Sequence, residues 1–449
     1  MNKSLFAQLV DKYFAPIVRK VTETINGRAE AEQLLHKTML DEEYSPDLKW
    51  ESTELEGAVV AAEVVSLDSK LPLKKRDALR TASGRIPKLG LKFRKDENDL
   101  TQLNIMLATG AAEDAVVRKL MNDVPRVVTG IEHRVEMMFQ QALSTGQVLI
   151  TGDETDGTGI RASFGYKEEN IFHCTAGVWG TDTAKPIDDI QQLENKAQED
   201  GRSLTGVMLS KASFEHLRKS TDGKLLVANV NGIAVTDVTK LAKPTREQML
   251  DALEAEFNVP FVIVNSAFKI EKPNGTRETI RPWEQANVVG ITSDKVGRLV
   301  YGRLAEETNP VNGVDYEKSG SYILVSKYSK NEPLEEFTAG QAFVLPIIDG
   351  GNSVYVLHTD AEGSGNFKVG LTTVQFGKSA DSQVVDVHYD GDGKVTASSS
   401  VAWATVKVVR DKVTINVTEN TGTSSRSGNI TVTDGKSSAT IAVTQTNKE

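Results

Sequence analysis

The sequence is short of the residues from which disulfides and metal sites are built. Cys174 is the one cysteine among 449 residues, so no disulfide can form within the chain, and folding in a reducing cytoplasm is the simplest interpretation. The six histidines are His36, His133, His173, His216, His358 and His388. The adjacent pair His173–Cys174 is the only close grouping, and neighbouring residues on a strand point to opposite faces, which suits neither ligation nor catalysis. We therefore expect no metal site, no cofactor and no catalytic residues.

Long apolar runs and an excess of positive charge are also absent. No stretch approaches 18 consecutive apolar residues, which argues against a membrane span, and polar residues interrupt the N-terminal segment, which does not have the apolar core of a signal peptide. The formal net charge of −10 argues against a protein that wraps nucleic acid with its whole surface. Phosphate-loop, dinucleotide and nucleophile-elbow motifs are missing, and the acidic run at 153–156 lacks EF-hand spacing. We therefore expect the function to depend on how the protein is built and not on a catalytic site.

What the sequence does contain is one long, well-bounded helical pattern from Val124 to Gln147. Its apolar residues form a single stripe at helical spacing, which predicts an amphipathic helix of about 22 residues and about 33 Å. Asp123 is the expected N-cap, Pro125 lies in the first turn, and Gly146 is the expected stop. We expect this helix to organise one domain through the core residues Val128, Ile131, Val135, Met138, Phe139 and Leu143.

The first 49 residues contain amphipathic helical pieces, one beginning near Leu5 and one between Ala29 and Leu40. No obvious core partner lies nearby in the sequence. Two alternatives therefore stay open: an N-terminal arm that packs on a neighbouring subunit, and an ordinary first helix.

Residues 50–104 change character, because lysine and arginine become frequent and proline and glycine interrupt the pattern. We predict a long extended loop outside the compact core, with a strand at 89–93, and such excursions are usually functional. Its basic residues are candidates for contact between subunits: Lys74, Lys75, Arg76, Arg80, Arg85, Lys88, Lys92 and Arg94. Only Phe93 interleaves with them, so base stacking on nucleic acid is poorly supported, and contact with an acidic neighbour is the favoured alternative.

Residues 105–359 mix short helices and strands, which predicts an α+β fold. Helices are expected at 111–122 and on both sides of a short strand at 207–209, with Ser210 as a helix cap. Strands are expected at 225–235 and 260–270, and a turn at 273–275 predicts a hairpin between 268–270 and 278–280. Further strands follow and end near His358.

A short polar linker at 360–367 precedes a segment with a different composition, residues 368–449. This segment is rich in valine, threonine and serine, and alternating strands recur every 8–12 residues, as in a small β-sandwich. Its expected core residues are Trp403, Val413, Ile415, Val417, Ile430, Val432 and Val443.

Three stretches resemble the lambda-like, gene E-type family of tailed-phage major capsid proteins. AAEVVSLDSKLPLKKRDALRTASGRIPKLGLKFR resembles the extended loop of that family, and IEHRVEMMFQQALSTGQVLITGD resembles its spine helix and the following turn. The stretch from NVPFVIVNSAFKI to GRLVYGRLAEE resembles the strands that return through the peripheral domain. The resemblance implies a Hong Kong 97-like fold: an N-terminal arm (1–49), an extended loop (50–104), peripheral and axial domains (105–359), the axial one near 205–260.

The C-terminal segment resembles the BACON domain, an immunoglobulin-like module common in Bacteroidetes and their phages. The resemblance is carried by Trp403, by Asn420, Arg426 and Ile430, and by the ending IAVTQ at 441–445. It implies a Bacteroides phage as the source and a sandwich displayed on the capsid, for decoration or for adhesion to glycans or mucus. The segment has few aromatics for stacking on sugars.

Together the resemblances imply a structural protein that is not an enzyme. It would self-assemble through hexamers and pentamers into an icosahedral head around double-stranded DNA, contacting the DNA only non-specifically. The implied partners are further copies, a portal, a scaffold and auxiliary capsid proteins; the implied location is the virion, assembled in the host cytoplasm. An encapsulin-like shell protein and a glycan-binding adhesin are the alternatives.

Overall fold

The computed structural model describes residues 5–26, 34–55, 79–150, 160–237, 240–272, 275–349, 351, 353–360, 367–388, 395–409, 412–435 and 437–447. The chain divides into two compact units. The first, here called the spine unit, comprises Met1–Gly146, Ser163–Tyr166 and Ser293–Val354. The second comprises Gln147–Ala162, Lys167–Thr292 and Tyr355–Glu449, and contains an α/β part and the C-terminal sandwich. Each is described by itself.

The spine unit is built on one sheet with strand order β1-β13-β16-β15-β14, to which β4 adds by pairing with β16. Its strands are β1 (Leu40–Tyr44), β4 (Lys88–Lys95), β13 (Gly297–Gly302), β14 (Val314–Ser319), β15 (Ile323–Lys330) and β16 (Glu335–Ile348). β1 runs parallel to β13, and the other described pairings are antiparallel. β16 is therefore the central strand that joins the two sides of the sheet.

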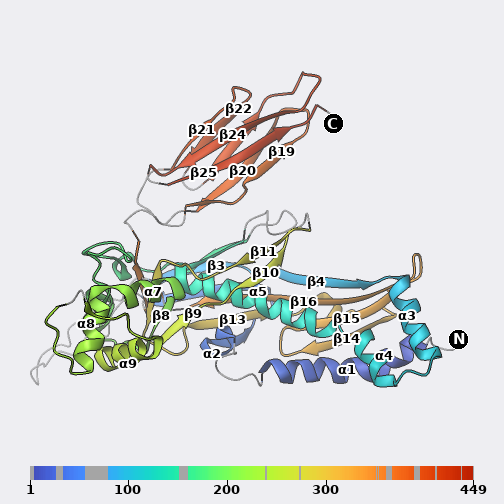
Figure 1. Ribbon diagram of the computed structural model, residues 1–449. Coiled ribbons are helices and arrows are strands. Elements are labelled where there is room, and N and C mark those ends of the chain that lie inside the picture. Colours follow the sequence, from blue (N-terminus) through green and yellow to red (C-terminus); the bar gives the residue numbers. More distant parts are fainter. Residues whose placement is uncertain are drawn as a thin grey trace, which may run out of the picture. The chain divides into compact units, whose positions relative to one another are not determined.

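The predicted long helix is α5 (Val124–Thr145), here called the spine helix, and it runs along this sheet (Figure 1). All six of its predicted core residues are buried. Two glycines allow the spine helix to lie close to the sheet, one on the sheet and one on the helix. A Cβ on Gly340 of β16 would lie 3.0 Å from Cβ of Val127, and a Cβ on Gly130 of the helix would lie 2.8 Å from the Leu91 side chain. Gly146 ends the helix at φ 74°, a left-handed conformation that costs glycine little.

The spine unit has four further described helices: α1 (Leu5–Asn26), which is as long as the spine helix, and the shorter α2 (Leu35–Met39), α3 (Glu97–Ala108) and α4 (Glu113–Leu120). The first predicted helical piece is α1; of the second, predicted between Ala29 and Leu40, residues 29–33 lie outside the described residues and 35–39 form α2. α1 packs against β14 and the spine helix through its apolar stripe, which is buried at Leu9, Val10, Phe14, Val18 and Ile25. None of the described helices is long and apolar enough to span a membrane.

The structure divides the predicted extended loop, residues 50–104, near Ile86. β2 (Lys49–Leu55) and β3 (Leu79–Arg85) form a separate antiparallel hairpin, as expected for such a loop. β4 and α3 differ from that expectation, because β4 is a strand of the main sheet and α3 is a helix. The alternating residues Leu89 and Leu91 face the spine helix, so burial draws this strand into the core.

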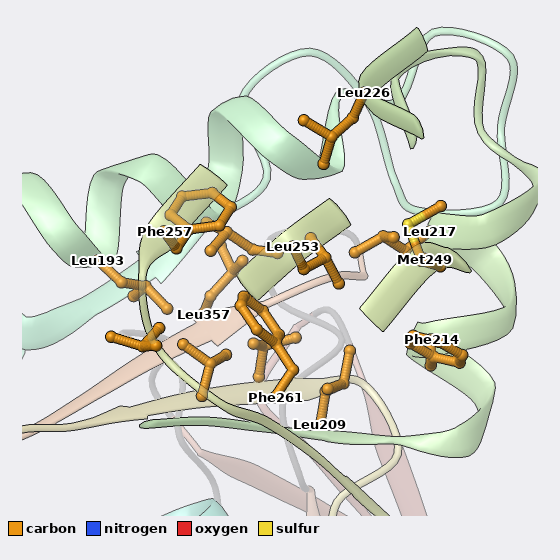
Figure 2. Close-up of a cluster of buried hydrophobic side chains, with 14 of the residues drawn as sticks. Leu193, Leu209, Phe214, Leu217, Leu226, Met249, Leu253, Phe257, Phe261 and Leu357 are labelled. Atoms are coloured by element: carbon orange, nitrogen blue, oxygen red, sulfur yellow. The ribbon is translucent and has the colours of Figure 1, made fainter. Parts of the chain in front are cut away.

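The α/β part is built on a sheet with strand order β7-β17-β12-β8-β9. Its strands are β7 (Ile171–His173), β8 (Gly206–Ser210), β9 (Phe261–Val264), β12 (Asn287–Ile291) and β17 (Val354–His358). Its helices are α6 (Pro186–Glu199), α7 (Lys211–Lys219), α8 (Thr221–Val230) and α9 (Arg246–Phe257). Figure 2 shows how leucine and phenylalanine side chains from these helices and strands meet in one apolar core.

Several local predictions for this part hold. Ser210 caps α7 by accepting a hydrogen bond from the Ser213 backbone N–H at 3.0 Å. The predicted hairpin is β10 (Phe268–Glu271) with β11 (Arg277–Ile280), in the register Phe268 to Ile280. Other short described elements are β5 (Gln147–Ile150), which pairs with β6 (Ile160–Ser163), and the 3₁₀ turn Glu168–Asn170; the 3₁₀ turn Ala305–Glu307 belongs to the spine unit.

The predicted strand at 225–235 is wrong, because residues 221–230 form α8. The Ser220 hydroxyl accepts a hydrogen bond from the Gly223 backbone N–H at 2.9 Å and so starts a helix. The apolar run at 225–228 is too short for its period to distinguish strand from helix, and Leu226, Val227 and Ala228 are buried. Packing of these residues in the tertiary core therefore stabilises the helix over a strand.

The C-terminal sandwich has two four-stranded sheets, β18-β20-β23-β22 and β19-β25-β24-β21. Their strands are β18 (Lys368–Val369), β19 (Thr373–Phe376), β20 (Asp381–His388), β21 (Thr396–Ser399), β22 (Ala404–Val409), β23 (Lys412–Val417), β24 (Arg426–Thr433) and β25 (Ser438–Gln445). The predicted aliphatic core residues are all buried. Trp403 differs from its prediction: it is only partly buried at the edge of this core, where Phe376 is the buried aromatic.

Candidate assembly surfaces and the clusters that position them

The β2–β3 hairpin is rooted in the spine unit by Trp50. This indole is buried, and its ring centroid lies 5.7 Å from that of Phe164. Gly84 on β3 leaves room for it, since a Cβ there would come within 2.7 Å of the indole Nε1. The Ile86 backbone N–H donates to the carbonyl oxygen of Leu48 at 2.9 Å, which closes the base of the hairpin. The root is thus rigid, whatever the hairpin contacts further out.

Arg298 on β13 is the second anchor of this root. Its guanidinium donates to both carboxylate oxygens of Asp349, with Nη2 3.0 Å from Oδ1, and also bonds the Glu43 carboxylate. Nη2 further donates to the carbonyl oxygen of Glu51 on β2 at 2.9 Å. The bonds to Asp349, opposed by partial burial and helped by Glu43, raise the pKa of Arg298 above its usual range. One side chain therefore ties the hairpin strand β2 to β1, β13 and the end of β16.

The basic residues predicted to contact a neighbour fall into three groups. Lys74, Lys75 and Arg76 lie outside the described residues. Arg80 and Arg85 belong to β3 of the hairpin, and Arg85 is exposed at its end.

The third group, Lys88, Lys92 and Arg94, shares one face of β4 with Gly90. Lys88 Nζ is 3.6 Å from Glu306, and Arg94 Nη1 is 2.9 Å from Glu335. Lys92 Nζ lies 4.9 Å from the ring centroid of Phe337, as in a cation–π contact. The structure therefore separates these three residues from the hairpin and gives each a partner within its own unit.

A buried polar cluster joins the N-terminal segment to the spine helix, and sequence analysis missed it. We call it the arm clasp: His36 and Lys37 of α2, Glu132 and Glu136 of the spine helix, and Tyr322. The sequence signal was present, because Glu132, Glu136 and Gln140 recur every four residues and so share one face of the helix. His36 lies about a hundred residues away, and the contact could not be read from spacing.

A cross-strand histidine pair in the α/β part was also missed. His173 and His358 are register partners on β7 and β17, with ring centroids 5.1 Å apart. His358 Nδ1 lies 2.7 Å from Asn287 Oδ1, and burial together with His173 lowers the pKa of His358 to about 4. Among the described residues, no group of three or more His, Cys, Asp or Glu side chains could hold a metal ion.

In the sandwich, the residues that carry the resemblance to BACON domains close one end of the fold. Gln445 is fully buried, and its Nε2 donates to the carbonyl oxygens of Lys378, Ser379 and Thr418 at 3.0–3.2 Å. Its Oε1 accepts from Arg426 Nε at 2.9 Å, and the same guanidinium lies 4.6 Å from the ring centroid of Trp403. We call Gln445, Arg426 and Trp403 the end plug. It is structural, and Arg426 occupies one face of the indole.

Gln445→Ala is expected to destabilise the sandwich by about 1–3 kcal/mol, because it leaves buried carbonyl groups and the Arg426 guanidinium without their partner. Hydrogen exchange of peptides from β24 and β25 in the full chain measures the loss. Gln383→Ala, at an exposed position of β20, is the control and should change exchange little. Equal protection in the two variants would remove the end plug as a stabilising element.

Comparison with known proteins gives the family. The family model of phage major capsid protein E matches residues 18–314, and the BACON model, described as an N-terminal binding domain, matches residues 393–446. A prophage protein of E. coli CFT073 described as a capsid protein is 13% identical over 76% of this chain and 98% of its own, with a TM-score of 0.47. No curated protein matches this chain.

Two further solved structures are similar at the same level. A phage-related protein of Bordetella bronchiseptica RB50 is 12% identical over 77% of this chain and 96% of its own, with a TM-score of 0.43. The capsid of Myoviridae phage XM1 is 11% identical over 72% of this chain and 90% of its own, with a TM-score of 0.38.

The mixed helix-and-strand core and the all-β C-terminal sandwich are as predicted, and the match to a capsid family over residues 18–314 makes the chain a capsid shell protein and a component of a virion. Because the family model covers residues 18–314, the chain belongs to the phage major capsid protein E family. The C-terminal sandwich is a BACON domain, which is likewise as predicted.

Proposed function

We propose that copies of this chain associate into hexamers and pentamers and close an icosahedral phage head around double-stranded DNA. The observation that carries the proposal is the capsid family match over residues 18–314. Heterologous contacts that close into rings produce such capsomers, and arms and hairpins let a subunit bury more area than a standard interface of about 1,600 Å².

Two features of the spine unit support contact through the β2–β3 hairpin. The hairpin is a two-stranded element that pairs with no other described strand, and its root is fixed by Trp50 and Arg298. A hairpin whose root is already held in place loses little conformational freedom on association. The basic residues that belong to the hairpin region of the sequence, from Lys74 to Arg85, would then meet an acidic surface of the next copy.

The remaining partners follow from the same proposal. A net charge of −10 leaves only local, non-specific contact with packaged DNA. A portal, a scaffold and auxiliary proteins would meet the shell during assembly in the host cytoplasm, and the chain would have no catalytic role.

The sandwich would be displayed on the head, for decoration or weak adhesion to glycans. Two of its aromatic side chains are described within residues 368–449. Phe376 is buried, and Trp403 faces Arg426, so neither offers a free ring for sugar stacking. Any glycan contact would therefore rest on polar groups of the sheet faces, with lower affinity than an aromatic platform provides.

Replacing Lys74, Lys75 and Arg76 by glutamate is expected to leave the subunit folded and to reduce shell yield by at least tenfold, because like charges would then face the acidic neighbour. Sedimentation velocity of the full chain separates shells from free subunits, and circular dichroism reports folding. Reversal of Lys378, Lys407 and Lys412 in the sandwich is the charge-matched control. Shells of normal size and yield from the 74–76 variant would contradict hairpin-mediated assembly.

A further inference from the structure

The arm clasp places one carboxylate at each nitrogen of a single buried imidazole. His36 Nδ1 lies 2.8 Å from Glu136 Oε2, and Nε2 lies 3.1 Å from Glu132 Oε2. A neutral imidazole has one N–H, so one of these contacts would bring a ring lone pair against a carboxylate oxygen. With both glutamates ionised, the geometry therefore fits the doubly protonated, cationic ring.

The other groups of the clasp match this charge state. Lys37 Nζ donates to Glu132 Oε1 at 2.8 Å, so two cations and two carboxylates balance. Neutral donors fill further acceptor positions. The Tyr322 hydroxyl donates to Glu132 Oε2 at 2.8 Å, and Gln140 Nε2 donates to Glu136 Oε1 at 2.6 Å. Loss of the His36 proton would leave a net negative charge in a site where both glutamates are buried.

The titration of the clasp follows from burial and these bonds. Burial alone would lower the pKa of His36, but the hydrogen bonds and charges of Glu132 and Glu136 outweigh it and raise that pKa above 6.5. Burial would raise the pKa of Glu132, but His36 and Lys37 lower it to about 2. Burial and the charge of Glu132 raise the pKa of Tyr322, and the charge of Glu42 adds to the effect. The Tyr322 hydroxyl therefore stays protonated.

The clasp holds a segment that has little stability of its own. α2 has five residues, too few to persist as an isolated helix, and it links the arm helix α1 to the edge strand β1. The His36 backbone N–H also donates to Glu136 Oε2 at 3.0 Å, so the spine helix holds both ring and backbone. A pocket of about 280 Å³ lies beside the clasp and is lined by Asn26, His36, Lys37, Glu42 and Tyr322 among others.

We propose that the arm clasp is a proton-controlled latch, which holds α1 and α2 on the spine helix while His36 is protonated and releases them when the ring loses its proton. Because the pKa of His36 is higher in the folded chain than in the unfolded one, its stabilisation is complete below about pH 6.5 and disappears as the pH rises through the folded value. Glu132 sets the acid limit, since its contribution disappears between about pH 4.5 and pH 2. The latch is therefore closed below about pH 6.5 and opens as the pH rises through the folded pKa of His36.

This latch lies within one chain and does not depend on shell formation. It goes beyond the proposed function by giving the arm two states, one packed on its own spine helix and one available to a neighbour. Its test uses free subunits, so failure of the latch and failure of the capsid proposal remain distinguishable.

Hydrogen exchange of the full-length, unassembled chain between pH 5.5 and 9, corrected for the intrinsic pH dependence of exchange, tests the latch. Protection of peptides from α1 and α2 should fall at least tenfold as the pH rises, while α9 in the other unit stays constant. In His36→Gln, protection of α1 and α2 should be low and independent of pH. Glu136→Gln should move the transition to lower pH, because one of the two carboxylates that favour the cation is neutral.

His216→Gln, at an exposed histidine of α7, is the matched control and should keep the wild-type profile. Equal loss of protection in α1, α2 and α9, or a wild-type profile in His36→Gln, would overturn the latch. If His36→Gln does not fold, the His36 ring resonance of the wild-type chain decides by NMR. A transition above pH 6.5 supports the latch, and one below pH 6.5 overturns it.

Discussion

Phe139→Ala is expected to lower the free energy of opening of the spine helix by about 3–5 kcal/mol and to abolish shells. Phe139 is fully buried on the helix that runs along β16, β4 and β15. Removing the ring loses its transfer free energy and leaves a cavity that a helix packed through glycine contacts cannot close. Native-state hydrogen exchange of peptides from 124–145 is the measurement, because a chain with two units need not unfold in one step.

Ile105→Ala is the matched control for that prediction. Ile105 lies on α3 of the same unit and is 56% exposed, so its truncation should change the free energy by less than about 0.5 kcal/mol. A loss of similar size in both variants would show that the spine helix is not the element on which the unit is built.

Arg298→Ala is expected to reduce shell yield by at least tenfold while the spine helix keeps its protection. The substitution removes charge-assisted bonds to Asp349 and Glu43 and the bond to the Glu51 carbonyl, each worth about 1.5–3 kcal/mol, and so loosens the hairpin root. The expected defect lies in assembly, because the sheet strands that Arg298 joins still pair through their backbones.

Sedimentation velocity gives the shell yield of this variant, and hydrogen exchange of peptides from β2 and β3 should show the loosened root directly. Arg277→Ala, which removes an exposed ion pair with Glu271, is the control and should assemble normally. Normal shells together with a loosened hairpin would mean that the hairpin does not carry assembly.

The elements that sequence analysis predicted are those with strong local signals. The spine helix has 22 residues, a continuous apolar stripe and a glycine stop, and the sandwich strands alternate in a composition suited to sheets. The hairpin between β10 and β11 followed from its turn residues. Each of these signals lies within a few residues of the element it specifies.

The features that sequence analysis missed depend on contacts between distant residues. α8 is a short apolar run whose helical state depends on the Ser220 cap and the surrounding core. The arm clasp joins His36 to Glu132, and the hairpin root joins Glu51 to Arg298. No periodicity encodes such pairs, since their members are ordinary polar residues until the fold brings them together.

The capsid role was expected from the resemblance. Residue spacing is a poorer guide to which surface residues contact a neighbouring subunit. Lysines and arginines between 74 and 94 form one basic run in the sequence, but β4 carries Lys88, Lys92 and Arg94 away into the main sheet. Because Leu89 and Leu91 alternate with these basic residues, burial of one face of β4 determines where its other face points.

Electron microscopy of the full chain, expressed together with its neighbouring genes, is the direct test of whether the protein forms shells. We expect closed shells, or free hexamer and pentamer rings, with the β2–β3 hairpin of each subunit lying against the next copy. A monodisperse monomer under these conditions would contradict a shell-forming role. The function of the protein would then have to be sought in binding by its C-terminal sandwich.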